Sequence, residues 1–421
     1  MRDWLVMFFL GADDDLFQFG QTLLDEATSV GSSDRIAVVA ELDPTRPGDD
    51  SLRGPLFKNR REMKKIGLTK GDPQAIIDFV DDSKGRYEAR HRLLMYWDHG
   101  NGWQNVHVYE NVVEATDIRR SQQHGPHGVP DKPATAPLFV NDLRAVLDEK
   151  RDIAIVAFDS CLMSMIEVAF QLRERAQFMV ASQHLLPAAR GWPYEALLRT
   201  LTLNPRMEPE ELVRTMVDTF AGSYNGANDA VTLSGLRLSA EVDRAVGAID
   251  SFSMALLDAI HVSDHGDDTV RDEIVYARLH TQSFGNPDYI DIVSFCEQIQ
   301  RRLPNEAKLN RLAELVKVAI ARLVVRHTRS GSESIAHANG VSIYFPHVVP
   351  RSEDAELIAE SYAKLDFANT LYCRWSSFLK VIVEGESIHN VLQLSSAAQM
   401  TVVSGCNCGE LGGAEPMKHV S

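Results

Sequence analysis

Cysteine is scarce in this chain of 421 residues, and its five copies are an odd number spread over distant positions. Small disulfide-stabilised domains need closely spaced, paired cysteines, so that class is excluded and a reducing compartment is favoured. Long apolar runs are also missing, because none approaches the roughly 18 residues that a membrane-spanning helix needs. We therefore expect a protein that uses no membrane and has a cytoplasmic location.

A signal peptide is the one targeting segment that the N-terminus suggests. Residues 4–10 (WLVMFFL) are apolar, but the run is short, Asp3 precedes it and residues 13–15 (DDD) follow it. No small-residue cleavage site comes after this run, so a buried first strand is the better interpretation.

Basic residues are outnumbered, with 43 Lys and Arg against 59 Asp and Glu, for a net charge of −16. An acidic surface repels phosphate backbones, which argues against nucleic acid as a partner and favours cationic substrates. A Gly-rich phosphate loop followed by Lys and Ser or Thr is also missing, so nucleotide hydrolysis has no support. The apolar fraction of 44% is ordinary for a globular protein with a large core.

Strand and helix patterns alternate over the first 200 residues. Predicted strands lie at 4–11, 35–41, 92–97, 152–158 and 177–182, with a polar hairpin at 56–67. Predicted helices lie at 14–30, 72–86, 138–149, 162–174 and 208–221. Apolar strands separated by helices predict a mostly parallel central sheet flanked by helices, with the carboxyl ends of its strands on one edge.

The second half is more helical. Further strands are predicted at 230–238 and 340–346, and helices at 239–261, 290–303, 307–327 and 354–383. We expect a core at 1–230, a helical part at 231–383 that completes the sheet, and a flexible tail at 384–421.

Two of the predicted strands end in reactive side chains. The strand 92–97 leads into His99 and Gly100, and the strand 152–158 leads into Asp159 and Cys161. Parallel strands would place His99 and Cys161 on one edge, where the imidazole can take the proton of the thiol. A helix starting at Cys161 would stabilise the thiolate, and the N–H groups of Gly100 and Cys161 would bind the oxyanion.

Structural roles for these residues stay open at this point. A cysteine is often a small buried apolar residue, and a single histidine beside a strand is usually structural. Cys296 and Cys373 fall in helical patterns and are interpreted as core residues. Four histidines could suggest a zinc site, but no Cys or carboxylate accompanies them, so such a site lacks support. A CxC pair lies in the tail and is interpreted as a bystander. The histidines are His99, His107, His124 and His127, and the CxC pair is Cys406 and Cys408.

The stretches around His99 and Cys161 resemble the clostripain family of cysteine peptidases. They are YWDHGNGW at 96–103, AFDSCLMSMIEVAFQL at 157–172 and MVASQHLLPAARGWPY at 179–194, with GVSIYFP at 340–346 and YAKLDFANTLYCRWSSFL at 362–379. The resemblance implies a caspase-like α/β sandwich, a Cys161–His99 dyad without a third residue, and peptide or protein substrates cut after Arg or Lys.

Asp159 matches the acidic position of that family which lines the pocket for the basic side chain. Its structural alternative is a cap on a helix beginning at Ser160 or Cys161. Ser182 lies in the matching substrate-binding segment, but Ser182, Gln183 and His184 stand where many relatives have acidic residues. The strictness of Arg over Lys therefore stays open.

No cofactor is expected, and calcium dependence has no support in the sequence.

The segment 110–137 is rich in Pro, Gly and His, and it interrupts the regular pattern. Family members often activate by cutting themselves between the two motifs, so we predict cleavage there, after Arg119 or Arg120, with Lys132 as a further candidate. An ordinary surface insertion is the alternative.

We expect a zymogen that an activating protease or a regulatory partner switches on in a stress or defence response. The second functional hypothesis is a catalytically silent caspase-like scaffold or signalling module.

Overall fold

The structure is a computed structural model that describes most of the chain. It covers residues 1–12, 16–44, 50–67, 73–104, 143–144, 146–147, 152–263, 269–346, 358, 360–369 and 371–383. Among these residues, no helix combines the length and apolarity that crossing a membrane requires.

Ten strands of the described chain form one sheet in the order β11-β9-β8-β7-β6-β1-β2-β3-β4, with β5 paired to β3. The five central strands are parallel: β1 (Arg2–Ala12), β2 (Ile36–Pro44), β6 (Ala89–Trp97), β7 (Ile153–Asp159) and β8 (Ala176–Ala181). Antiparallel strands extend both edges: β3 (Leu52–Phe57), β4 (Arg60–Arg61) and β5 (Lys64–Lys65) on one side, β9 (Val231–Arg237) and β11 (Val324–Ser330) on the other. The prediction of a mostly parallel central sheet is confirmed.

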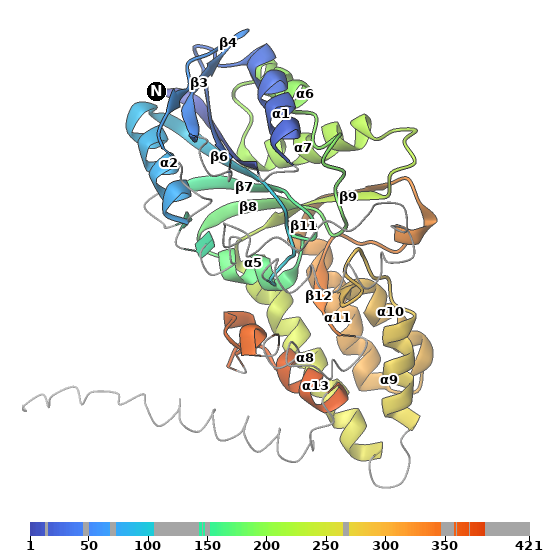
Figure 1. The fold of residues 1–421 in the computed structure, drawn as a ribbon. Helices are drawn as coiled ribbons and strands as arrows, with labels where there is room; N and C mark the ends of the chain where they lie inside the picture. Colours follow the sequence, from blue (N-terminus) through green and yellow to red (C-terminus); the bar gives the residue numbers. More distant parts are fainter. Residues whose placement is uncertain are drawn as a thin grey trace, which may run out of the picture.

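Helices cover both faces of this sheet, because its strands are apolar on both sides (Figure 1). Along β1, Val6 and Phe8 pack with α1 (Phe17–Val30), α6 (Tyr194–Leu203) and α7 (Pro209–Ser223). Met7 and Phe9 pack into the opposite core with α2 (Pro73–Arg86), α5 (Ile166–Leu172) and α8 (Ala240–Ser263). The period of two in β1 thus separates two cores, one on each side of the sheet.

The C-terminal half adds a layer of helices below the sheet in Figure 1. These are α9 (Thr269–Leu279), α10 (Ile292–Arg302), α11 (Ala307–Leu323) and α13 (Trp375–Ile382). This half also contains the short helices η2 (Glu333–Ile335) and η3 (Asp366–Ala368). Between them, β10 (Tyr289–Asp291) and β12 (Ser342–Tyr344) form a separate antiparallel pair. The strand predicted at 340–346 therefore exists, but it does not join the central sheet.

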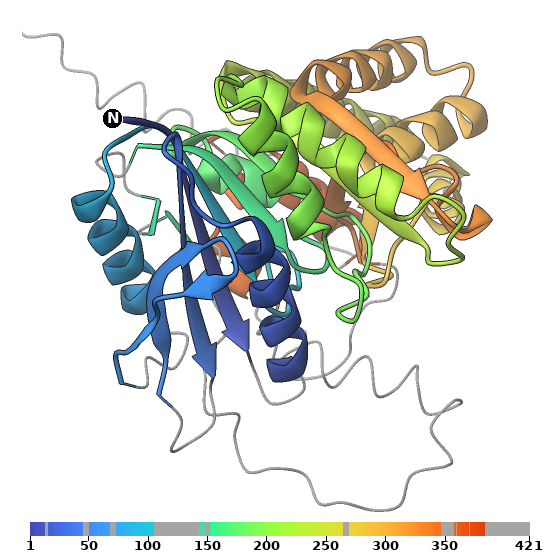
Figure 2. The same ribbon diagram turned by 90° about the horizontal axis from the view of Figure 1, so that it is seen from above.

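Several predicted boundaries are wrong. The helix predicted at 307–327 ends at Leu323, and the β-branched Val324 and Val325 begin strand β11, which runs beside α7 along the sheet edge (Figure 2). The closing helix predicted at 354–383 is interrupted: among its described residues, 358 and 360–363 are helical, followed by the short η3 and then α13. Helices α6 and α9 were not predicted, although α6 buries Tyr194, Leu197, Leu198 and Leu201 at helical spacing.

Candidate active site

The register between β6 and β7 brings the turns that carry His99 and Cys161 to the same edge of the sheet. Leu93 pairs with Ile155 and Trp97 pairs with Asp159, which is a constant offset of 62 residues. His99 and Cys161 each follow two residues after the last pair and keep that same offset. Both turns therefore leave the same edge of the sheet from neighbouring parallel strands, as predicted.

Gly100 joins these two turns at the level of the backbone. A Cβ at this position would lie 2.9 Å from the Cys161 nitrogen and 2.8 Å from Cβ of Ser160, closer than side chains normally approach. The turn that carries His99 therefore packs directly on the backbone of Cys161. His99 itself is exposed, and its main-chain N–H donates a 2.7 Å hydrogen bond to Oδ1 of Asp98.

The turn after Cys161 is not helical, so the predicted helix N-terminus at the thiol is wrong. Helix α5 begins at Ile166, and Leu162 has a φ of 65°, in the left-handed region. Ser164 explains this course, because its N–H donates to the Ser182 carbonyl (2.8 Å) and its carbonyl accepts from Ser342 N–H (2.8 Å). These long-range bonds satisfy the backbone in place of a first helical turn.

The thiol of Cys161 is half-buried and contacts the main chain of Leu186. The Leu186 N–H donates to Sγ at 3.3 Å, and the Leu186 carbonyl oxygen lies 3.9 Å from Sγ. Burial raises the pKa of the thiol, the Leu186 N–H opposes that rise, and the negative charge of Asp159 adds to it.

Asp159 ends β7 with a buried carboxyl on the side of α1 and α6. Its Oδ2 accepts hydrogen bonds from the Tyr194 hydroxyl (2.9 Å) and from the Trp192 N–H (3.4 Å). Burial raises the pKa of Asp159 to about 7, these two donors lower it, and the charge of Glu26 raises it further. Because no helix begins at Ser160 or Cys161, the alternative role of Asp159 as a helix cap is wrong.

Ser182 has a buried side chain at the end of β8. Its hydroxyl donates to the His184 carbonyl (2.9 Å) and lies 2.9 Å from the Thr232 hydroxyl. Gln183 is also buried, and its side-chain amide donates to Asp291 (3.1 Å). Ser182 thus contributes its carbonyl to the Ser164 turn, while a contact of Ser182 with substrate stays a prediction.

Comparison with known proteins bears out the family resemblance found in the sequence. A sequence model described as the clostripain family matches residues 51–381. The chain belongs to the clostripain family. It is a cysteine-type endopeptidase, and it is 22% identical to clostripain of Hathewaya histolytica over 410 residues, which cover 81% of this chain and 74% of that protein.

Two solved structures share the fold. One is an inactive zymogen C11 protease from Parabacteroides distasonis, with a TM-score of 0.62 and 16% identity over 88% of this chain and 98% of that one. The other is a secreted C11 cysteine protease from Bacteroides thetaiotaomicron bound to an irreversible peptide inhibitor, with a TM-score of 0.60 and 16% identity over 87% and 98%. The caspase-like sandwich expected from the sequence is confirmed at this level.

Three residues of this clostripain-family site escaped prediction: Glu26, Leu186 and Tyr194. Glu26 lies on α1, and its Oε2 accepts the Tyr194 N–H at 3.1 Å. It also lines a pocket of about 420 Å³ together with Glu195, Arg190 and other residues. Leu186 and Tyr194 lie within the stretch at 179–194 that resembles the family, but nothing local there shows that they contact Cys161 and Asp159, and Glu26 lies in no quoted stretch at all.

Other predicted residues of the clostripain-family chain lie away from the site or outside the described residues. Cys296 and Cys373 are fully buried free cysteines in the core, as predicted. The segment 110–137 falls outside the described residues, as does the tail 384–421. The predicted residues in these two ranges are Arg119, Arg120, Lys132, His124, His127, Cys406 and Cys408, and His107 is likewise not described.

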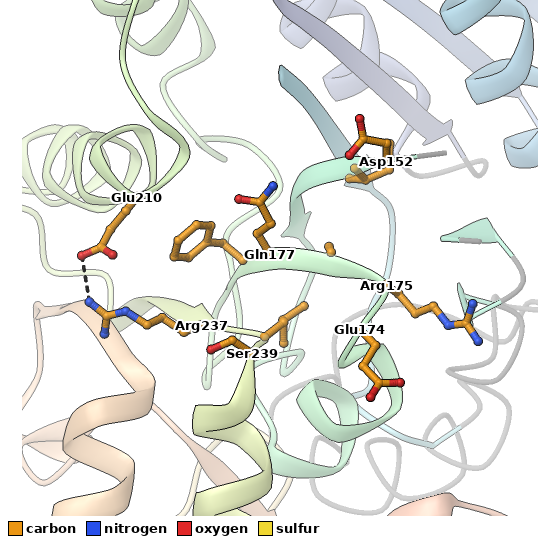
Figure 3. Close-up of a pocket in the computed structure, with 11 residues that line it drawn as sticks. Asp152, Glu174, Arg175, Gln177, Glu210, Arg237 and Ser239 are labelled. Carbon is orange, nitrogen blue, oxygen red and sulfur yellow. Dashed lines mark hydrogen bonds and ion pairs between the residues drawn. The ribbon is translucent and has the colours of Figure 1, made fainter. Parts of the chain in front are cut away.

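A second pocket, of about 480 Å³, lies at the amino ends of β7 and β8, opposite the edge that carries Cys161 (Figure 3). Its walls carry both signs of charge, but Arg237 pairs with Glu210 (2.8 Å) and Asp152 pairs with Arg92 (2.8 Å). These ion pairs leave the pocket without a clear charge preference for a ligand.

Among the described residues, no group of three or more His, Cys, Asp or Glu could hold a metal ion.

Proposed function

We propose that this clostripain-family peptidase cleaves after Arg or Lys, with Cys161 as the nucleophile and His99 as the general acid and base. The shared register of the two turns, joined at Gly100, carries the proposal. His99 takes the thiol proton, and the thiolate sulfur attacks the carbonyl carbon before the scissile bond. The electron pair moved onto oxygen is held by the N–H groups of Gly100 and Cys161.

The second half of the cycle releases the two products. Collapse of the oxyanion breaks the C–N bond, and the leaving amine takes its proton from the imidazolium of His99. Water activated by His99 then hydrolyses the thioester and restores the thiol. Peptides and proteins with Arg or Lys before the scissile bond are the substrates in this scheme.

Asp159 supplies the charge that selects a basic side chain in this proposal. Its ionised form attracts a guanidinium or ammonium group, and its position two residues before Cys161 places it beside the nucleophile. Glu26 adds a second carboxylate nearby, since its charge acts on Asp159. The acidic residue expected but missing at 182–184 thus has a counterpart on α1.

Assays on a fluorogenic peptide with a single Arg test the dyad. We expect Cys161→Ala and His99→Ala each to abolish turnover under reducing conditions, while His280→Ala, at another exposed histidine, leaves it unchanged. Turnover that persists in Cys161→Ala would identify another nucleophile. Absence of turnover in the unaltered protein, with and without an activating protease, would favour the catalytically silent module.

Activation by cleavage is the second part of the proposal. A relative from Parabacteroides distasonis is described as an inactive zymogen. We expect mass spectrometry of the purified protein to show cuts after Arg119 or Arg120, or after Lys132, and Cys161→Ala to stay full length. If both proteins remain intact, self-cleavage is wrong, and an activating protease or partner must be sought by adding cell extract to Cys161→Ala.

Location and calcium dependence stay predictions. Two similar structures are of a C11 cysteine protease from Bacteroides thetaiotaomicron that is described as secreted, whereas the sequence favours a cytoplasmic enzyme. We expect turnover to be the same in calcium and in a calcium chelator. Fractionation of the producing cells, followed by detection of the chain, distinguishes the two locations.

A further inference from the structure

We propose that the main-chain N–H of Leu186 stabilises the thiolate of Cys161, in the role that a helix N-terminus was expected to fill. The inference rests on the proposed function of Cys161 as nucleophile. It begins from two observations: α5 starts only at Ile166, and the Leu186 N–H donates to Sγ at 3.3 Å. The group that faces the sulfur therefore comes from the segment after β8, and not from the chain that follows the cysteine.

The Leu186 amide interacts more strongly with the thiolate than with the thiol. A hydrogen bond to an anion is shorter and about twice as strong as one between neutral groups. The Leu186 carbonyl, 3.9 Å from Sγ, can accept only from the protonated thiol, and it is the more distant of the two groups. The geometry thus favours loss of the proton, against the effect of burial and of the Asp159 charge.

The segment 184–187 is fixed on both sides, which holds this amide in place before any substrate binds. On one side, the His184 carbonyl accepts the Leu162 N–H at 3.3 Å, and His184 Nδ1 accepts the Gly285 N–H at 3.1 Å. Leu185 packs against Gly285, where an added Cβ would lie 2.9 Å from Leu185 Cδ1. These contacts tie the segment both to the cysteine turn and to the C-terminal half.

On the other side, the chain after Leu186 closes a turn on itself. The Pro187 carbonyl accepts the N–H groups of Arg190 (3.1 Å) and Gly191 (2.8 Å). The Trp192 N–H and the Tyr194 hydroxyl follow within the same segment and donate to Asp159. One segment after β8 therefore supplies donors both to the nucleophile and to the carboxylate proposed for substrate selection.

Two substitutions of Leu186 separate its amide from its side chain. Leu186→Pro removes the N–H, whereas Leu186→Ala keeps it and serves as the matched control. Both are made in the His99→Ala background, so that the imidazole does not contribute. The readout is the rate at which iodoacetamide alkylates Cys161 at a series of pH values, measured by mass spectrometry of the peptide that contains this residue.

We expect the midpoint of this pH profile to rise by roughly one to two pH units in Leu186→Pro and to stay unchanged in Leu186→Ala. An unchanged midpoint in a folded Leu186→Pro protein would overturn the proposal, as would equal shifts in both variants. If Leu186→Pro does not fold, replacing residue 186 by its α-hydroxy acid removes the same N–H with little change of shape, and the same shift is required.

The alkylation profile needs no peptidase activity, so this inference can fail independently of the proposed function. If Cys161→Ala abolishes turnover but the Leu186 variants do not shift the midpoint, only the role of the Leu186 amide is wrong. If Cys161→Ala retains turnover, the proposed nucleophile itself is wrong, whatever the alkylation shows.

Discussion

At the level of single residues, burial of the Asp159 carboxyl makes its charge, and with it the proposed selection of basic substrates, depend on pH. Because burial raises its pKa to about 7, Asp159 carries its full charge only above neutral pH. We expect kcat/KM on an Arg peptide to rise as the pH increases through about 7. Asp159→Asn should lower kcat/KM about 100-fold or more and flatten this limb of the profile. A variant that keeps both its Arg preference and its pH profile would exclude Asp159 from substrate selection.

Tyr194, a hydrogen-bond partner of Asp159, offers a second test of the charge on the Asp159 carboxyl. Its hydroxyl donates to Oδ2 of Asp159 at 2.9 Å and thereby stabilises the ionised form. Removing the hydroxyl in Tyr194→Phe should raise the pKa of Asp159 and move the rise of kcat/KM to higher pH. Tyr372→Phe, at an exposed tyrosine, is the control. An unmoved profile in Tyr194→Phe would show that Asp159 does not govern this limb.

The close packing of the turn after β6 on the turn of Cys161 depends on the absence of a side chain at Gly100. An added methyl group would meet Ser160 Cβ at 2.8 Å and the Cys161 nitrogen at 2.9 Å, so the two turns must separate. We expect Gly100→Ala to lower kcat/KM about 100-fold, since a shift of about 1 Å in a reacting group has that effect. Gly85→Ala on α2 is the matched control, because a Cβ there meets nothing within 4 Å. Equal activities of the two variants would contradict the close packing of the turns.

At the level of elements, the strands that consist of short apolar runs could be predicted from the sequence. The runs before His99 and Cys161 identify β6 and β7, and parallel order places both residues on one edge. The start of α5 could not be predicted, because residues 162–165 are spaced like a helix and are held out of one by Ser182 and Ser342. The Leu186 amide and the Glu26 carboxylate were missed for the same reason: tertiary packing alone brings them to the site.

For the whole molecule, the C-terminal half contributes to the geometry of the site as well as to the core. The Tyr289 hydroxyl donates to the Asn101 carbonyl at 2.7 Å, which fixes the turn that carries His99. Ser342 holds the cysteine turn, and Gly285 holds the segment that contains Leu186. The turn that carries His99, the turn that carries Cys161 and the segment that contains Leu186 thus each have a partner in the chain after residue 280. The orientation of the dyad therefore depends on the folding of both halves.

Glu167 links the two halves in the core and makes stability depend on pH. Its Oε1 accepts the Tyr344 N–H (2.8 Å) and the Tyr362 hydroxyl (3.1 Å), and burial raises its pKa from 4.5 to about 7. A folded-state pKa above that of the unfolded chain means that the proton stabilises the folded state. This contribution is full below about pH 4.5 and is lost as the pH rises through about 7.

Glu167→Gln removes this titration while keeping an oxygen that can accept both hydrogen bonds. We expect the melting temperature to fall less between pH 5 and pH 8 in Glu167→Gln than in its parent, both measured in the Cys161→Ala background to prevent self-cleavage. Glu314→Gln, at an exposed carboxylate whose pKa is lowered, should not reduce that fall. Equal falls in Glu167→Gln and its parent would mean that Glu167 stays ionised in the core across this range, and the pH dependence would then have to come from other groups such as Asp159.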